Sequence, residues 1–319
     1  MKIRYSFLLL MTTFSLFAQK EDFITHYEKS GFKETSTYDQ TIEYCKKLDK
    51  ASEWVHYSTF GISLQGRELP LLIIDKNSMK EAREVHQTEK AVVLIQAGIH
   101  AGEINGKDAG LMLIRDIVIH KKHSNLLNQI TLVFIPIYNV DGHENFSAYG
   151  RINQNGPKEM GFRTNANNLN LNRDYMKADA AETQAWLKLF LTWLPDFFID
   201  IHSTDGADYQ YALTYGMETF GTMSPQLTSW QKDVFIKYVD KRMRKAKFPI
   251  FPYVGFRNWH DPRSGLKSWV GNPMFSQAYT AMQNRPGLLI ESHMLKDYET
   301  RVSSTYEMLV HSLTILNKE

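Results

Sequence analysis

Hydrophobic and polar positions along the 319-residue chain follow two alternating patterns. Short apolar runs of strand length are separated by longer segments in which apolar residues recur at helical spacing. This alternation is typical of an α/β sheet covered by helices. The predicted strands are Leu69–Ile74, Ala91–Ile95, Thr131–Pro136, Phe197–Ile201 and Leu288–Ile290. The predicted helices are Tyr38–Lys50, Gly106–Ile119, Ala180–Trp193, Ser229–Lys245 and Thr300–Leu316.

Polar side chains follow the ends of four predicted strands. In open α/β sheets, ligands bind in the crevice beyond the carboxyl ends of the strands. We therefore expect these side chains to meet at one edge of the sheet. They are, in chain order, His100, Glu103, Asn139, Asp141, His202 and Glu291.

Three of these residues have the chemistry of a catalytic zinc site. Such a site uses imidazole nitrogen and carboxylate oxygen from three residues and leaves a fourth position for water. His100 and Glu103, three residues apart where a loop enters a predicted helix, can reach one ion. This short motif often arises by chance, but His202, at the point where an apolar strand opens into Ser-Thr-Asp-Gly, completes the set. A histidine at that strand end could otherwise be an ordinary core residue.

Two further features complete a hydrolytic site. Glu291 ends a buried strand, where an unpaired carboxylate is rare. It is either a general acid/base beside metal-activated water or a structural, salt-bridged residue. The Asn-rich segment from Arg163 to Arg173 supplies guanidinium groups, which bind carboxylates through two parallel hydrogen bonds. Its composition alone would equally fit a surface loop.

These residues, in this order, resemble the zinc carboxypeptidases related to carboxypeptidase A. The resemblance covers roughly Trp54 to Met294 and includes the Gly61–Arg67 turn and Asn139-Val-Asp-Gly142. It implies a three-layer α/β/α fold with a mixed, largely parallel sheet of about eight strands. It also implies one Zn²⁺ per chain and a peptide substrate with a free C-terminus. The implied roles are metal binding by His100, Glu103 and His202, acid/base catalysis by Glu291, carboxylate binding by Asn172 and Arg173, and oxyanion stabilisation by Arg163.

The chain departs from the family pattern in three places. Asn170 occupies a position where family members often have an aspartate that orients a zinc-ligating histidine, and such partners tune ligand basicity. Arg163 lies closer to Asn172 than its counterpart does in the pancreatic enzymes. The substrate-capping tyrosine has no clear counterpart, and Tyr279 is the candidate, with core packing as the alternative.

The first eighteen residues differ in character from the rest. Lys2 and Arg4 precede a short apolar run that ends at Ala18, a pattern typical of a secretory signal peptide rather than a membrane span. We therefore expect a signal peptide at 1–18, a catalytic domain at 19–319, and a secreted or periplasmic protein with no stable membrane association after cleavage. Cleavage would lower the formal charge from +2 to 0, which argues against a nucleic-acid partner. Cys45, the single cysteine, is expected to be a small buried residue.

Other functions share parts of this pattern. A zinc amidohydrolase resembling aspartoacylase would use the same metal ligands and the Asn-Arg pair on small N-acyl amino acids. A peptidase of cell-wall stem peptides would suit an exported bacterial protein. An inactive zinc-binding module that recognises C-termini would have little use for Glu291. The sequence does not specify which C-terminal side chain is preferred.

Overall fold

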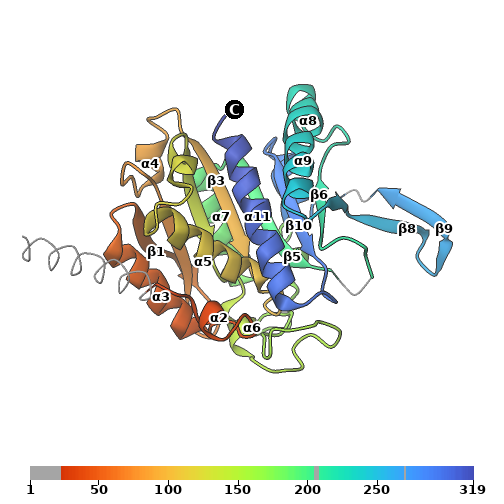
Figure 1. The fold of residues 1–319 in the computed structure, drawn as a ribbon, viewed down its shortest axis with the longest axis horizontal. Coiled ribbons are helices and arrows are strands. Elements are labelled where there is room, and N and C mark those ends of the chain that lie inside the picture. Colours follow the sequence, from red (N-terminus) through yellow and green to blue (C-terminus); the bar gives the residue numbers. More distant parts are fainter. Residues whose placement is uncertain (1–22, 205–207, 269–270) are drawn as a thin grey trace, which may run out of the picture.

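The computed structural model describes residues 23–204, 208–268 and 271–319. The expected signal peptide, residues 1–18, lies outside the described residues. A single sheet of eight strands crosses the molecule in the order β1-β2-β4-β3-β5-β10-β6-β7 (Figure 1). Its strands are β1 (Val55–Ile62), β2 (Glu68–Ile74), β3 (Ala91–Ala97), β4 (Ile130–Ile135), β5 (Phe197–Ser203), β6 (Leu213–Met217), β7 (Ile250–Pro252) and β10 (Gly287–Ser292). The central strands β4, β3, β5 and β10 are parallel, whereas β1, β2 and β6 pair antiparallel with a neighbour.

Helices cover both faces of this sheet. The central strands are apolar at nearly every position because successive side chains point to opposite faces and both faces are covered. On β3, for example, Val93 and Ile95 pack into the core under one helical layer, and Val92 and Leu94 pack under the other. The first layer contains α3 (Tyr38–Ala51), α5 (Asn105–Val118), α9 (Lys237–Lys245) and α11 (Tyr298–Leu316), and the second contains α4 (Ala82–Val85) and α7 (Ala181–Trp193). The predicted α/β/α architecture, with a mixed sheet of about eight strands, is therefore confirmed.

All five predicted strands and all five predicted helices are present, with ends that differ by a few residues. The predicted helix Ser229–Lys245 consists of the end of α8 (Pro225–Trp230), a π-helical turn (Gln231–Ile236) and α9. The Gly61–Arg67 turn, which includes the last two residues of β1, joins the edge strand β1 to β2. The sequence pattern around this turn had suggested that both strands lie at an edge, but β2 lies between β1 and β4. Cys45 is fully buried, and burial raises the pKa of its thiol to about 12.

Other elements were not predicted from the sequence. Strands β8 (Val254–Asn258) and β9 (Asp261–Ser268) form a separate antiparallel hairpin that projects from the body of the molecule (Figure 1). The short helices α2 (His26–Lys29), α6 (Val140–Glu144) and α10 (Ser276–Met282) were also missed, as were β6 and the edge strand β7. No helix within the described ranges is long and apolar enough to cross a membrane.

Candidate active site

Strands β3 and β5 bring the three predicted metal ligands together. His100 and Glu103 lie in the segment between β3 and α5, and His202 belongs to β5. The segment turns at Gly98, whose φ of +70° is a left-handed conformation that glycine adopts without strain. A Cβ atom at Gly98 would also lie only 3.1 Å from the Ile104 side chain. The glycine therefore lets the chain reverse direction tightly enough to place both ligands beside the end of β5.

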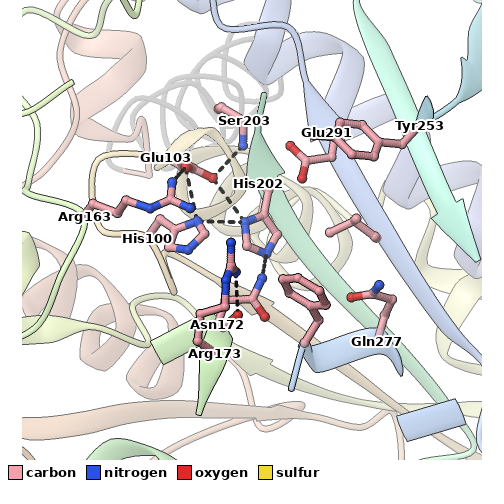
Figure 2. Close-up of a pocket in the computed structure, with 12 residues that line it drawn as sticks. His100, Glu103, Arg163, Asn172, Arg173, His202, Ser203, Tyr253, Gln277 and Glu291 are labelled. Atoms are coloured by element: carbon pink, nitrogen blue, oxygen red, sulfur yellow. Dashed lines mark hydrogen bonds and ion pairs between the residues drawn. The ribbon is translucent and has the colours of Figure 1, made fainter. Parts of the chain in front are cut away.

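The geometry of this trio suits one small cation. Nδ1 of His100 lies 3.1 Å from Nδ1 of His202. His100 Nδ1 also lies 3.1 Å from Glu103 Oε1, and His202 Nδ1 lies 3.1 Å from Glu103 Oε2. All three side chains are buried, and Figure 2 shows them converging on one point. Ligands bound about 2.0–2.1 Å from a tetrahedral zinc ion would be roughly 3.3 Å apart. The observed separations are close to that value.

Neighbouring side chains orient both imidazoles. His100 Nε2 contacts Asn170 Oδ1 at 3.0 Å, and His202 Nε2 contacts Asp200 Oδ2 at 2.7 Å. Both partners are acceptors, so each Nε2 carries a hydrogen in the neutral ring and each Nδ1 presents a lone pair. A cation bound between these two nitrogens and the Glu103 carboxylate would offset the repulsion between the two lone pairs. The site therefore fits a metal ion, with the outer hydrogen bonds found around zinc-binding histidines.

Charged neighbours set the electrostatics of the trio. Burial by itself would raise the pKa of Glu103, but the neighbouring His100 and Arg151 hold that pKa well below its ordinary value. Burial lowers the pKa of His100. Burial would also lower the pKa of His202, but Asp200 raises it well above its usual range. Glu103 is consequently an anion, the form in which a carboxylate binds a metal.

Glu291 faces the ligand set from the adjacent strand. It pairs directly with His202 in the parallel register of β10 and β5, so the two side chains emerge on the same face of the sheet. Figure 2 shows its carboxylate directed towards the ligand set from the side opposite Arg163. The structure thus places the predicted acid/base next to the predicted metal ligands.

The predicted anion-binding residues also reach the site. Asn172 and Arg173 belong to a single 3₁₀ turn, η2 (Leu171–Arg173), and Arg173 stacks over the Phe275 ring at 4.4 Å. Asn172 lies 3.4 Å from His202 Nε2 through its amide nitrogen. Arg163 donates from Nη1 to Glu103 Oε1 at 3.0 Å. One pocket is lined by His100, Glu103, Arg163, Asn172, Arg173, His202, Ser203, Tyr253, Phe275, Gln277, Leu289 and Glu291.

Comparison with known proteins agrees with this geometry. The model of the family described as zinc carboxypeptidase matches residues 41–247, which include the metal trio and the Asn172-Arg173 pair. The chain belongs to the zinc carboxypeptidase family. Carboxypeptidase 2 of Trichophyton rubrum is 27% identical over 169 residues, which cover 52% of this chain and 28% of that protein. The chain thus matches less than a third of the length of this curated relative.

Solved carboxypeptidase structures share the fold. A metallo-carboxypeptidase from Burkholderia cenocepacia superposes with a TM-score of 0.65 and 17% identity, over 89% of this chain and 70% of that one. Carboxypeptidase A from Helicoverpa armigera gives a TM-score of 0.63 and 19% identity, over 90% and 75% of the two chains. This member of the zinc carboxypeptidase family therefore has the fold of these solved structures at low sequence identity.

The structure does not bring Tyr279 to the pocket. Its ring packs within 6.2 Å of the rings of Tyr175, Trp186 and Phe190, centroid to centroid, in the core under α7. The core-packing alternative describes this placement. The pocket-lining tyrosine is Tyr253, which directly precedes β8. Sequence reasoning could not identify it because nothing around residue 253 signals that this segment returns to the site.

Three other site residues were missed from the sequence. Asp200 stands two positions before His202 on the same face of β5, and this strand alternation was a usable signal. Arg151 lies 2.7 Å from Glu103 Oε1, although it is 48 residues further along the chain. Gln277 lines the pocket from the first turn of α10. No local pattern marks the last two.

Asn139 and Asp141 support the site from outside the pocket. The Asn139 amide donates to the backbone carbonyl of Arg163 at 3.3 Å. Asp141 accepts hydrogen bonds from Ser63 Oγ and from the backbone nitrogen of Gln65, and it pairs with Arg67 at 2.8 Å. The two secondary family signatures thus contact each other and anchor the loop that carries Arg163. Asn139 and Asp141 were expected at the same edge of the sheet as the metal ligands, and their contacts there are structural.

Proposed function

We propose that this protein is a zinc-dependent metallocarboxypeptidase that removes C-terminal residues from peptides. The observation that carries the proposal is the convergence, in one pocket, of the metal trio with Glu291 and the Asn172-Arg173 pair. A metal trio alone would serve many hydrolases. An adjacent guanidinium and amide select substrates that present a carboxylate.

His100, Glu103 and His202 would hold the zinc ion, which when bound polarises a carbonyl group and lowers the pKa of water. Glu291 accepts the proton of the attacking water and returns it to the leaving nitrogen as the C–N bond breaks. Arg163 offers several N–H donors; while one contacts Glu103, another can stabilise the negative charge that develops on the carbonyl oxygen. Hydrolysis then yields a shortened peptide and one free amino acid.

Arg173 and Asn172 are proposed to hold the C-terminal carboxylate of the substrate. Their arrangement is rigid: the Asn172 Oδ1 atom accepts from the backbone nitrogen of Ser276 at 3.0 Å, and Arg173 donates to the Asn172 carbonyl at 2.7 Å. Because both groups are fixed at one end of the pocket, a bound carboxylate would set which peptide bond faces Glu291. The reaction is therefore confined to the last bond of the chain.

The test compares one peptide as a free acid and as a C-terminal amide. Losing a charge-assisted hydrogen bond costs about 1.5–3 kcal/mol, so the amide should react about 10- to 100-fold more slowly. Arg173→Ala should slow the free acid and leave the amide nearly unchanged. The matched control is Arg263→Ala, which removes an exposed arginine of β9 whose side chain is 91% accessible. Equal cleavage of both peptides, or cleavage at internal bonds, would refute the carboxypeptidase proposal.

We also propose that the protein is exported, on the basis of the composition of residues 1–18. The expected mature chain begins near Gln19. Sequencing the N-terminus of protein recovered from the periplasm or medium checks this, and a cytoplasmic protein that retains Met1 would contradict it.

A further inference from the structure

Gln277 is a buried amide that lines the active-site pocket. Its side chain is 1% exposed, and among the residues the structure describes neither its amide oxygen nor its amide nitrogen has a hydrogen-bond partner. Folded proteins pair most of their buried polar groups, so a side chain with both atoms unpaired needs a reason. Figure 2 shows the Gln277 amide on the Glu291 side of the pocket, away from Arg163.

The position of Gln277 relative to the carboxylate-binding residues is fixed. The preceding residue, Ser276, donates its backbone N–H to Asn172 Oδ1 at 3.0 Å and its hydroxyl to Asp200 Oδ2. Phe275 lies against the Arg173 guanidinium. The segment that carries Gln277 is therefore tied to the proposed carboxylate anchor. A residue held there by its carboxylate has its own side chain next to this segment.

Two residues near Gln277, Leu289 and Glu218, favour a neutral substrate side chain at this end of the pocket. Leu289 lines the same pocket and offers an apolar surface to methylene groups. Glu218 lies close to the amide: a Cβ atom on Gly271 would be 2.5 Å from Glu218 Oε1 and 2.8 Å from Gln277 Nε2. Glu218 is buried, accepts the Gly271 N–H at 2.7 Å, and is absent from the described residues that line the pocket. The amide of Gln277, rather than this carboxylate, faces a substrate.

We propose that Gln277 recognises the side chain of the released residue and that the site prefers a carboxamide there, that of glutamine or asparagine. A carboxamide offers an NH2 group that donates and an oxygen that accepts, and it pairs with a second carboxamide through two hydrogen bonds. A site built to hydrogen-bond its substrate discriminates strongly against analogues that lack those groups, because its own polar atoms are then left unpaired. This inference rests on the proposed carboxypeptidase function and adds the substrate class to it.

The test is a set of peptides identical except for the C-terminal residue, incubated with the zinc-loaded protein. Glutamine is compared with methionine, which has similar length but no amide, and with glutamate, lysine and phenylalanine. We expect kcat/KM for glutamine to exceed that for methionine about 10- to 100-fold, the effect of leaving a buried amide unpaired. Gln277→Met should reverse this order by lowering the rate for glutamine and raising it for methionine. The matched control is Gln283→Met, which changes an exposed residue at the end of α10 and should leave the preference for glutamine over methionine unchanged.

The outcomes separate the two proposals. Cleavage of every C-terminal residue without a preference for the carboxamide, or with a preference for phenylalanine, overturns the role of Gln277 and leaves the carboxypeptidase proposal intact. A preference for lysine also overturns it and indicates that Glu218 selects the substrate. If no peptide loses its C-terminal residue, the proposed function and this inference both fail. Unchanged selectivity in Gln277→Met, with a wild-type melting temperature, also overturns the inference.

Discussion

The two proposed zinc-binding histidines have unequal partners, and this inequality can be tested by a single substitution. Asp200 is a charged acceptor for His202, whereas Asn170 is a neutral acceptor for His100. Asn170→Asp keeps the oxygen that accepts from His100 Nε2 at 3.0 Å. It also keeps the acceptor for the backbone nitrogen of Asn172 at 3.1 Å. The substitution therefore adds a negative charge without removing a hydrogen bond.

The expected effect is tighter zinc binding. A hydrogen bond between neutral groups contributes about 0.5–1.5 kcal/mol and one to a charged group about 1.5–3 kcal/mol. The difference, about 1–1.5 kcal/mol, corresponds to roughly a tenfold change in affinity. Asn170 is only partly buried, so solvent screens the added charge. We therefore expect zinc to bind about 3- to 10-fold more tightly. The gain appears in metal affinity because a charged acceptor makes the imidazole a stronger ligand.

Competition with a chromogenic chelator at fixed pH measures the zinc dissociation constant directly and needs no activity. Asn167→Asp is the control, because this exposed residue of the same loop receives the same charge away from His100. Asp200→Asn is the reverse change and should weaken binding by about 10- to 100-fold. If Asn170→Asp binds zinc within twofold of wild type, or Asn167→Asp tightens binding equally, the reasoning about the His100 partner is refuted.

Three further predictions follow from the same residues and from one buried lysine. The Glu291→Gln variant should bind zinc normally, and its kcat should fall by about 10²- to 10⁴-fold. The exposed Glu89→Gln variant is the control, and a wild-type kcat in Glu291→Gln would show that Glu291 is not the acid/base. Chelation should abolish activity and lower the melting temperature, because zinc binds the folded state, and added zinc should restore both in wild type but not in His202→Ala. Burial lowers the pKa of Lys107 from its ordinary 10.5 to about 8, so between these pH values the unfolded chain binds more protons and the stability of wild type rises with pH. The stability of Lys107→Met relative to wild type should therefore fall by roughly 1–3 kcal/mol over that range in urea denaturation, and a constant difference would contradict the shifted pKa.

The central part of the fold was predictable because its signal is local. Strands β3, β4, β5 and β10 are buried on both faces and read as continuous apolar runs. Strand β6, the edge strand β7 and the hairpin β8–β9 lack such runs. Strand β6 pairs with β10, which is distant in sequence, and β7, β8 and β9 have exposed positions. Such strands take their conformation from pairing more than from their own composition.

The sequence by itself determined the reactive groups of the site. His100, Glu103, His202 and Glu291 stand at or just beyond the ends of buried strands, and the order of the parallel strands brings those ends to one edge. A residue placed by strand order can be predicted because the strand signal fixes where its side chain emerges.

Only the tertiary structure decided which residues surround these groups. Tyr253 and Gln277 reach the pocket from a loop and from the start of a short helix, and Arg151 reaches Glu103 from a loop. Tyr279, two residues beyond Gln277, packs into the core instead. Successive residues in a helix point about 100° apart, so one turn of α10 sends Gln277 to the pocket and Tyr279 towards Trp186. The direction in which α10 packs, and hence which of these side chains meets a substrate, depends on contacts such as Ser276 with Asn172 that join segments about a hundred residues apart.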